Sequence, residues 1–389
     1  MTSVRRIKEV GSSALLVAML PLLVALPAQG SQLPASRAPV IRVLHGSGES
    51  PIPGVVSCPT RTTCWGATYQ GVARSTNAGA TWSWKVSSIL RRLERKYGPL
   101  FSGNLAAISC STTTTCVVVG SVQGSTSFGR DFGSAGLVLS TNDGVHWHTT
   151  IIRGIGGLEA VHCAAQDRCY VGGSSSPDWN SPAVIYESSL GHDAWHLQRT
   201  PQRAAGVWVL QCTSALDCVA LTDKVPSGQW HEGVGYNGAL TIETQDGGQR
   251  WRVTADRPKN LPGGLSCGPS DECLLGNQPG IEQRSTNVPL LVSSDGGTTW
   301  HSRSTPSSLG EFDTIDCQSP TSCWALTGTR YIERSVNEGR SWSIWTLPEV
   351  FGTPESMSLT CPTDGRCLVS SEDWTGLHSS RIAVVSVTL

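Results

Sequence analysis

Apolar and polar residues alternate in a short segment that recurs seven times along the chain and always ends at a cysteine. In each copy an aliphatic residue stands two positions before the cysteine, and a polar residue stands one position before it. The aliphatic residues are Val56, Ile108, Val161, Leu210, Leu265, Ile315 and Leu359, and the polar ones are Ser57, Ser109, His162, Gln211, Ser266, Asp316 and Thr360. This period of two predicts a β-strand in which the cysteine and the aliphatic residue share one face.

A second strand is expected directly after each of these strands. Five residues rich in turn formers separate the first cysteine from a second one, as residues 111–115 do, and an apolar run such as residues 117–119 follows. The pattern predicts a hairpin whose two cysteines face each other. Their Cα atoms should lie roughly 4.5 to 5.5 Å apart, which a disulfide can bridge.

All fourteen cysteines follow this spacing. Metal binding is the alternative, but zinc ligands usually stand two to four residues apart and converge from different segments. We therefore expect no metal and no cofactor, and we expect seven disulfides. The predicted bridges are Cys58 to Cys64, Cys110 to Cys116, Cys163 to Cys169, Cys212 to Cys218, Cys267 to Cys273, Cys317 to Cys323 and Cys361 to Cys367.

A second motif recurs between the cysteine pairs, with Ser or Thr, then Asp or Asn, then Gly, and a final Trp. Copies cover residues 75–82, 140–147, 244–251, 293–300 and 335–342, and a degenerate copy covers residues 188–195. Asp and Asn side chains bond nearby amides and glycine takes positive φ, so the motif predicts a tight hairpin. We expect the Trp ring to pack between neighbouring units.

Successive cysteine pairs lie 44 to 55 residues apart, and seven copies at this period are typical of a repeat architecture. We predict an all-β fold, a seven-bladed β-propeller with four-stranded antiparallel blades. Strands A and B flank the cysteine turn, strand C precedes the second motif and strand D follows it. The last unit ends before a strand D, so we predict that the N-terminal strand at residues 40–44 closes the last blade.

The second motif resembles the Asp-box, Ser-x-Asp-x-Gly-x-Thr-Trp, of the BNR-repeat propellers. This sialidase-like group, akin to the WD40/YVTN-like repeat superfamily, includes sialidases, xyloglucan-degrading glycosidases, sortilin-type receptors and photosystem II stability and assembly factors. The seven units and the near-complete use of the chain are most similar to the assembly-factor type. The resemblance implies a non-catalytic scaffold that binds a protein or a glycan.

A carbohydrate-active glycoside hydrolase, sialidase-like or xyloglucanase-like, is the alternative function. Sialidases of the group carry an Arg-Ile-Pro motif, whereas the nearest segment here is Arg42-Val43-Leu44. Xyloglucanase-type enzymes need two carboxylates about 5 to 9.5 Å apart. The candidate carboxylates in predicted B–C loops are Asp131, Asp223, Glu232 and Glu282. Because carboxylates are ordinary in exposed loops, we assign no catalytic residue and favour the scaffold over an enzyme.

The first 30 residues predict an export signal, with a basic start at Arg5, Arg6 and Lys8, an apolar run at residues 14–26, and small residues after it. An uncleaved anchor is the alternative, but the run is short for a membrane span. We expect a signal peptide at residues 1–30, a linker at residues 31–38 and the propeller at residues 39–389. The mature protein is expected to be a monomer outside the cytoplasm, secreted or in the cell envelope, without a membrane span.

The net charge of −1 gives no general attraction to nucleic acid, which we exclude as a partner. The partner surface is instead expected on the B–C and D–A loops, which share one face of a propeller. Aromatic and arginine side chains in the long B–C loops are typical of an interface core, although they could also cover the central channel. The candidates are Phe128, Arg130, Asp131, Trp179, Trp230, His231, Glu232 and Tyr236.

Residues 88–97 interrupt the repeat and predict a short basic helix in the first D–A loop. Ile89, Leu90, Leu93 and Tyr97 form one apolar face at helical spacing. The helix can pack on the propeller rim through this face. The alternative is a docking element for an acidic partner or a membrane surface.

Overall fold

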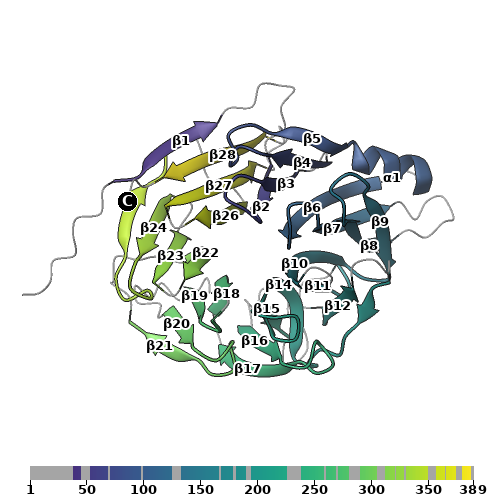
Figure 1. Ribbon diagram of the computed structural model, residues 1–389. Helices are drawn as coiled ribbons and strands as arrows, with labels where there is room; N and C mark the ends of the chain where they lie inside the picture. The colour runs from purple at the N-terminus through teal and green to yellow at the C-terminus, as the bar shows by residue number, and fades with distance from the viewer. Residues whose placement is uncertain are drawn as a thin grey trace, which may run out of the picture. The chain divides into compact units, whose positions relative to one another are not determined.

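Seven four-stranded antiparallel sheets form a ring in the computed structural model, so the chain is a seven-bladed β-propeller, as predicted (Figure 1). Each blade runs from an innermost strand A to an outermost strand D. The structure describes residues 38–44, 53–68, 71–97, 100–124, 133–165, 168–177, 181–189, 194–225, 238–257, 260–268, 270–279, 290–304, 312–319, 321–327, 330–348, 356–363, 365–373 and 379–386.

Blades 1 to 6 each take four consecutive strands, and blade 7 combines the two ends of the chain. The strands are β2 (Val55–Ser57), β3 (Cys64–Thr68), β4 (Gly71–Ser75) and β5 (Ser83–Ser87) in blade 1; β6 (Leu100–Cys110), β7 (Cys116–Gly124), β8 (Ser134–Thr141) and β9 (His148–Arg153) in blade 2; β10 (Gly157–Ala165), β11 (Arg168–Ser174), β12 (Ala183–Ser189) and β13 (His196–Leu197) in blade 3; β14 (Ala204–Cys212), β15 (Cys218–Lys224), β16 (Ala239–Thr244) and β17 (Arg252–Arg257) in blade 4; β18 (Asn260–Cys267), β19 (Cys273–Pro279), β20 (Leu290–Ser293) and β21 (His301–Arg303) in blade 5; β22 (Phe312–Ser319), β23 (Ser322–Thr327), β24 (Tyr331–Ser335) and β25 (Ser343–Thr346) in blade 6; and β26 (Ser356–Thr363), β27 (Arg366–Asp373), β28 (Ser379–Ser386) and β1 (Val40–Leu44) in blade 7.

The N-terminal strand closes the last blade, as the count of motifs predicted. Strand β1 pairs antiparallel with β28, from Val40 opposite Ser386 to Leu44 opposite Ile382. Ile41 and Val43 pack against the core shared by blades 6 and 7. The innermost strands also close the ring, because each contacts the innermost strand of the next blade and β26 contacts β2.

The hydrophobic core is divided among the blade interfaces. The described apolar side chains form seven clusters, and each cluster joins two neighbouring blades. Trp65 of blade 1, for example, is fully buried in the same cluster as Val118 and Leu139 of blade 2. Burying one large apolar side chain contributes about 1.5 to 3 kcal/mol to folding. Every interface between neighbouring blades therefore contributes to the stability of the ring.

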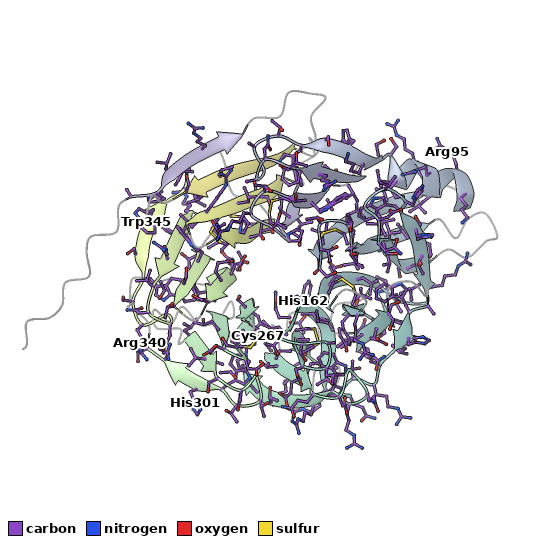
Figure 2. All side chains as sticks on the ribbon, in the orientation of Figure 1. Arg95, His162, Cys267, His301, Arg340 and Trp345 are labelled. Atoms are coloured by element: carbon purple, nitrogen blue, oxygen red, sulfur yellow. A yellow bond between two sulfur atoms is a disulfide. The ribbon has the colours of Figure 1, made fainter. Side chains whose placement is uncertain are left out.

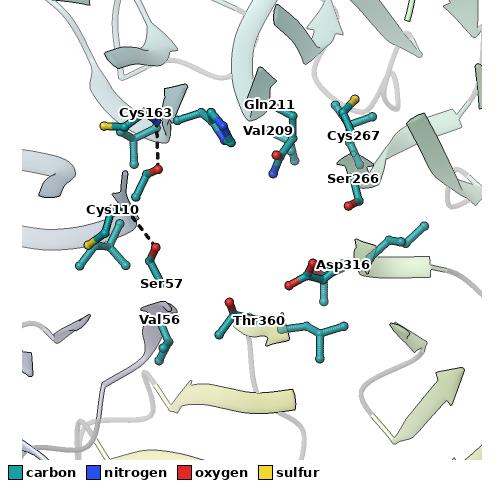
Figure 3. Close-up of a pocket in the computed structure, with 18 of the residues that line it drawn as sticks. Val56, Ser57, Cys110, Cys163, Val209, Gln211, Ser266, Cys267, Asp316 and Thr360 are labelled. Atoms are coloured by element: carbon teal, nitrogen blue, oxygen red, sulfur yellow. Dashed lines mark hydrogen bonds between the residues drawn. The ribbon is translucent and has the colours of Figure 1, made fainter. Parts of the chain in front are cut away.

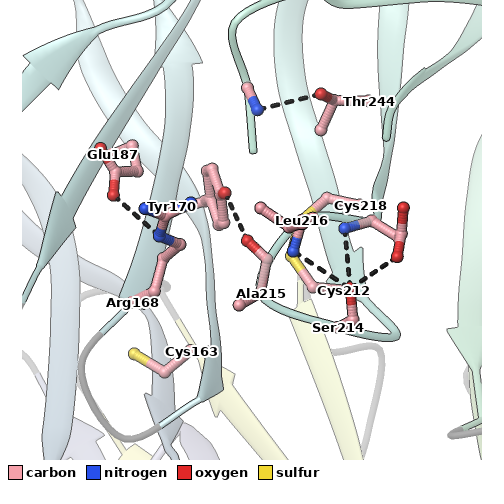
Figure 4. The surroundings of a disulfide bond; sticks show 12 residues. Cys163, Arg168, Tyr170, Glu187, Cys212, Ser214, Ala215, Leu216, Cys218 and Thr244 are labelled. Carbon is pink, nitrogen blue, oxygen red and sulfur yellow. Dashed lines mark hydrogen bonds and ion pairs between the residues drawn. A yellow bond between two sulfur atoms is a disulfide. The ribbon is translucent and has the colours of Figure 1, made fainter. Parts of the chain in front are cut away.

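All seven predicted disulfides are present, and no cysteine is free. The paired Cα atoms lie 3.9 to 4.1 Å apart, closer than a typical cross-strand pair. Next to the bridge between Cys212 and Cys218, the Tyr170 hydroxyl of blade 3 donates a 2.8 Å hydrogen bond to the Ala215 carbonyl (Figure 4). The turn that a disulfide closes thus also ties one blade to the next.

The C–D turns form a repeated hydrogen-bonded loop. In blade 1 the Ser75 hydroxyl accepts the Gly79 amide at 2.9 Å, and the Asn77 side chain accepts the Thr81 amide at 2.9 Å. The turn-closing Gly79 has a φ of 82°, and an added Cβ would lie 2.8 Å from Leu368 of blade 7. The motif tryptophan that ends each of the six turns packs in a cluster shared with the preceding blade.

The turn of blade 2 is one residue shorter than the sequence alignment of the motifs suggested. Thr141, rather than Ser140, accepts the Gly144 amide at 2.9 Å. The Trp147 indole N–H has no hydrogen-bond partner among the described residues, whereas the Trp82 indole donates to the Gly79 carbonyl. Trp147 instead makes an edge contact with Trp65, with ring centroids 5.6 Å apart.

The predicted insert helix is present as α1 (Ile89–Tyr97), between β5 and β6. Ile89 and Leu93 are buried and Leu90 packs beside them in the core of blades 1 and 2, so the apolar face does pack on the propeller rim. Figure 2 shows Arg95 on the outside of this helix. Within the described part of the chain, no helix is long and apolar enough to cross a membrane.

Candidate functional site

The loop residues predicted to bind a partner lie outside the described residues. These are Phe128, Arg130, Asp131, Trp179, Trp230, His231, Glu232 and Tyr236, and the candidate carboxylate Glu282 also lies outside them. Asp223 is described, and it belongs to β15 rather than to the B–C loop that the sequence suggested. The described part of this face therefore consists of the strand ends and the short segments next to them.

A pocket of about 220 Å³ lies on the B–C and D–A face of blades 2 to 4. We call it the Trp208 pocket. Its lining includes Gln123 of blade 2, Glu159 of blade 3, and Trp208 and Asp223 of blade 4. Three blades therefore supply polar and aromatic groups to one small cavity.

Two β-bulges place the main side chains of the Trp208 pocket. In β10, Leu158 pairs with Gly173 and Ala160 with Gly172, so Glu159 is an extra residue between them. In β14, Val207 pairs with Thr222 and Val209 with Leu221, which makes Trp208 the extra residue. A bulge redirects a side chain that regular alternation would place on the other face.

The aromatic side of the pocket is open to a ligand. Trp208 is 41% exposed, and its indole N–H donates a 2.7 Å hydrogen bond to the Asp223 carboxylate. Among the described residues, a Cβ added to Gly206 would come within 4 Å of the Trp208 indole alone outside its chain neighbours, at 3.9 Å. The ring is therefore held by one edge, and the described residues leave part of its surface exposed.

The acidic side of the pocket is desolvated. Burial raises the pKa of Glu159 to about 7, and this carboxylate has no partner among the described residues. Burial also raises the pKa of Asp223 to about 6, and the hydrogen bond from Trp208 opposes part of this rise. A cationic group that entered the pocket would favour both charged carboxylates.

The B–C loops that carry the predicted binding residues start at this pocket. Gln123 lies two residues before the loop at residues 125–132, and Pro177 immediately precedes residues 178–180. Asp223 lies three residues before the loop at residues 226–237. The described segments that precede residues 125–132, 178–180 and 226–237 thus lie beside one cavity.

The opposite face holds a second cavity at the mouth of the central channel, with a volume of about 780 Å³ (Figure 3). The polar residue before each first cysteine lines it in all seven blades. The Ser57 hydroxyl accepts the Cys110 amide at 3.1 Å, Ser109 accepts the Cys163 amide at 3.0 Å, and Asp316 accepts the Cys361 amide at 2.6 Å. These side chains therefore join successive blades around the channel.

Two ionisable residues stand in the channel mouth. Burial raises the pKa of Asp316 to about 6, against the hydrogen bonds from Cys361 and Gln318. Burial lowers the pKa of His162 to about 4, so the imidazole is neutral near pH 7. Figure 2 shows His162 at the inner edge of the ring.

No group of three or more metal-ligating side chains occurs among the residues that the structure describes.

The fold places the chain among the seven-bladed β-propellers, and solved structures of this class resemble it. YCF48 from Cyanidioschyzon merolae has a TM-score of 0.57 and 13% identity over 89% of this chain and 98% of that one. YCF48 bound to D1 peptide has a TM-score of 0.56 and 12% identity, covering 90% and 97%. The predicted resemblance to an assembly factor of photosystem II is confirmed at the level of fold.

An enzyme with this architecture also resembles the chain. The GH74 xyloglucanase from Xanthomonas campestris has a TM-score of 0.54 and 14% identity, over 88% of this chain and 55% of that chain. The chain thus spans about half of that enzyme. No protein-family profile and no curated protein matches the sequence. At these low identities the likeness extends to the fold alone, and a shared fold does not imply a shared function.

Proposed function

We propose that the protein is a non-catalytic scaffold that binds an exposed segment of another exported protein on the B–C and D–A face of blades 2 to 4. The Trp208 pocket is the observation that carries this proposal. Half-exposed tryptophans fixed by a hydrogen bond are typical anchors of protein interfaces, because they give a large contact area at a low entropic cost. The YCF48 propeller bound to D1 peptide, which has the same fold, supports a peptide as ligand.

The chemistry of the pocket favours a basic side chain in the bound segment. A lysine or arginine that lay over the Trp208 ring would combine a cation–π contact with the charges of Glu159 and Asp223. Its entry would also supply the counter-charge that Glu159 lacks among the described residues. The predicted loop residues Phe128, Arg130, Asp131, Trp179, Trp230, His231, Glu232 and Tyr236 would extend the contact around this centre.

We propose that the protein acts in an oxidising compartment outside the cytoplasm. Seven disulfides indicate such a compartment. Residues 1–30 would direct export and be removed, and residues 31–38 would link the cleavage site to the propeller. Cleavage is tested by N-terminal sequencing of the protein recovered from the medium or the envelope.

A peptide-display selection tests the binding function. The immobilised full propeller should enrich peptides with lysine or arginine from a random library, and Trp208→Ala should reduce the affinity of an enriched peptide by roughly tenfold or more. Tyr331→Ala is a matched control, because Tyr331 is 44% exposed, starts β24 on the same face and belongs to blade 6. Equal losses in both variants, or no enrichment, would contradict the proposal.

A glycoside hydrolase is the second candidate function. The specific observation in its favour is that Glu159 and Asp223 line one pocket and both have raised pKa values, as a general acid requires. Sialoside and xyloglucan substrates should be screened with the wild type, Glu159→Gln and Asp223→Asn. The scaffold function predicts no turnover, and a turnover that either substitution abolishes would replace it with the hydrolase.

A further inference from the structure

A groove of about 390 Å³ lies between α1 and the outer strands of blades 1 and 2. We call it the Lys85 groove. Its walls come from β5, from α1, and from β8, the C–D turn and β9 of blade 2. Neither the repeat nor the fold requires this groove, because it depends on the helix inserted between β5 and β6.

The rim of the Lys85 groove is basic. Lys85 of β5 and Arg92 and Lys96 of α1 all line it, and all three are exposed. Arg92 and Lys96 are four residues apart, so they lie on one face of the helix. Glu94 lies about 200° from Arg92 around the helix axis and points away from that face. Among the described residues that line the groove there is no carboxylate.

The floor of the groove is apolar. Val86, Leu93 and Leu139 are buried side chains that line it, and Trp147 forms part of one wall. An inorganic anion such as phosphate would interact only with the basic rim, because it has no apolar group to bury on this floor. An aliphatic side chain flanked by carboxylates matches both parts of the groove.

Asp143 is a carboxylate in the C–D turn next to the groove. Asp143, two residues before the groove-lining Val145, lies 2.6 Å from the His146 imidazole. The hydrogen bond from His146 and those from two backbone amides lower the pKa of Asp143 well below its usual range. Asp143 is therefore already engaged within its own turn.

We propose that the Lys85 groove binds an acidic peptide segment in which an aliphatic residue stands between carboxylates. The aliphatic side chain would enter the apolar floor, and the carboxylates would pair with Lys85 and Arg92 at the rim. A planar anionic membrane fits less well, since it could reach the rim but not the recessed floor. This site would act independently of the Trp208 pocket, because blades 1 and 2 form it at their outer strands.

Fluorescence polarisation with defined peptides tests the proposal. The probe is a labelled, acetylated peptide Glu-Asp-Leu-Asp-Glu, and its control is the neutral peptide Gln-Asn-Leu-Asn-Gln. The full propeller should bind the acidic probe and not the neutral one. Replacing Arg92 and Lys96 together by Glu should weaken binding by roughly tenfold or more, since two attractions become repulsions.

The same helix provides a matched control. Arg91 and Arg95 are also four residues apart and exposed, but neither lines the groove, so replacing both by Glu makes an equal change in net charge. This control should leave binding within about threefold of the wild type. If the helix double variant fails to fold, Lys85→Glu on β5 makes the same test from the opposite wall.

Several results would overturn the proposal. Equal losses in the groove variant and the control variant would mean that only the overall charge of the helix matters. No binding of the acidic probe by the wild type, or equal binding of the neutral peptide, would exclude the acidic segment as the ligand. Binding to vesicles of phosphatidylglycerol that depends on Arg92, without binding of the peptide, would assign the surface to membranes instead.

Discussion

Tryptophan residues occur in two different environments in this molecule, which differ in how far the side chain is buried. Trp82 ends a C–D turn and is buried in the core of blades 7 and 1, where its loss would leave a cavity. Trp208 lies half-exposed over a pocket and is held by Asp223. Only the second arrangement leaves a ring surface that a partner can contact.

Buried carboxylates make the stability of the propeller depend on pH. Glu333 of β24 is 1% exposed and accepts a 2.6 Å hydrogen bond from Thr327, and burial raises its pKa from 4.5 to about 7. Because the folded pKa is raised, the stability that the neutral form provides is complete below about pH 4.5. It is lost as the pH rises through about 7.

The substitution Glu333→Gln removes this dependence. The free energy of unfolding of the wild type should fall relative to that of the variant between pH 4.5 and about 7, by at most about 3 kcal/mol. Urea unfolding of both proteins at pH 5 and pH 8 measures the difference. Other ionisable residues, including His162 and Asp316, cancel because both proteins contain them. Parallel pH profiles would contradict the buried, ionisable state of Glu333.

At the level of elements, the sequence predicts the regular parts of the propeller and misses its bulges. The cysteine spacing predicts every A–B hairpin, and the missing strand D predicts the role of β1. Period-two alternation puts Trp208 on the face of Leu210 and Cys212, which are core residues. The bulge turns Trp208 outward, and Glu159 departs from the face of Val161 in the same way. These bulges could not be predicted, because the pattern of apolar residues does not show where one strand contains an extra residue.

Strand β1 is the element on which ring closure depends most directly. Deleting residues 40–44 should lower the melting temperature by more than deleting residues 32–36, because only the first deletion exposes the edge of β28 and the apolar contacts of Ile41 and Val43. Differential scanning calorimetry of the two mature proteins makes the comparison. Equal melting temperatures in both deletions and the wild type would show that the pairing of β1 with β28 does not stabilise the ring.

On the scale of the whole molecule, the groups that join the blades and the groups proposed to bind a partner occupy different faces. Disulfides, C–D turns and the polar ring of the channel mouth share one face and join each blade to the next. The Trp208 pocket lies on the other face, at the described ends of strands in blades 2 to 4. The groups that join the blades thus lie away from the proposed binding face, as is usual where loops on a stable scaffold carry function.

Hydrogen–deuterium exchange of the full propeller, with and without a peptide enriched on it, tests the binding face most directly. Exchange should become slower on peptide addition in the segments that contain Glu159, Trp208 and Asp223, which belong to three different strands. Trp208→Ala should remove this protection, while Tyr331→Ala should retain it. Protection confined to the channel mouth around Ser109 and Asp316, or protection that Trp208→Ala leaves intact, would contradict the assignment of the binding face.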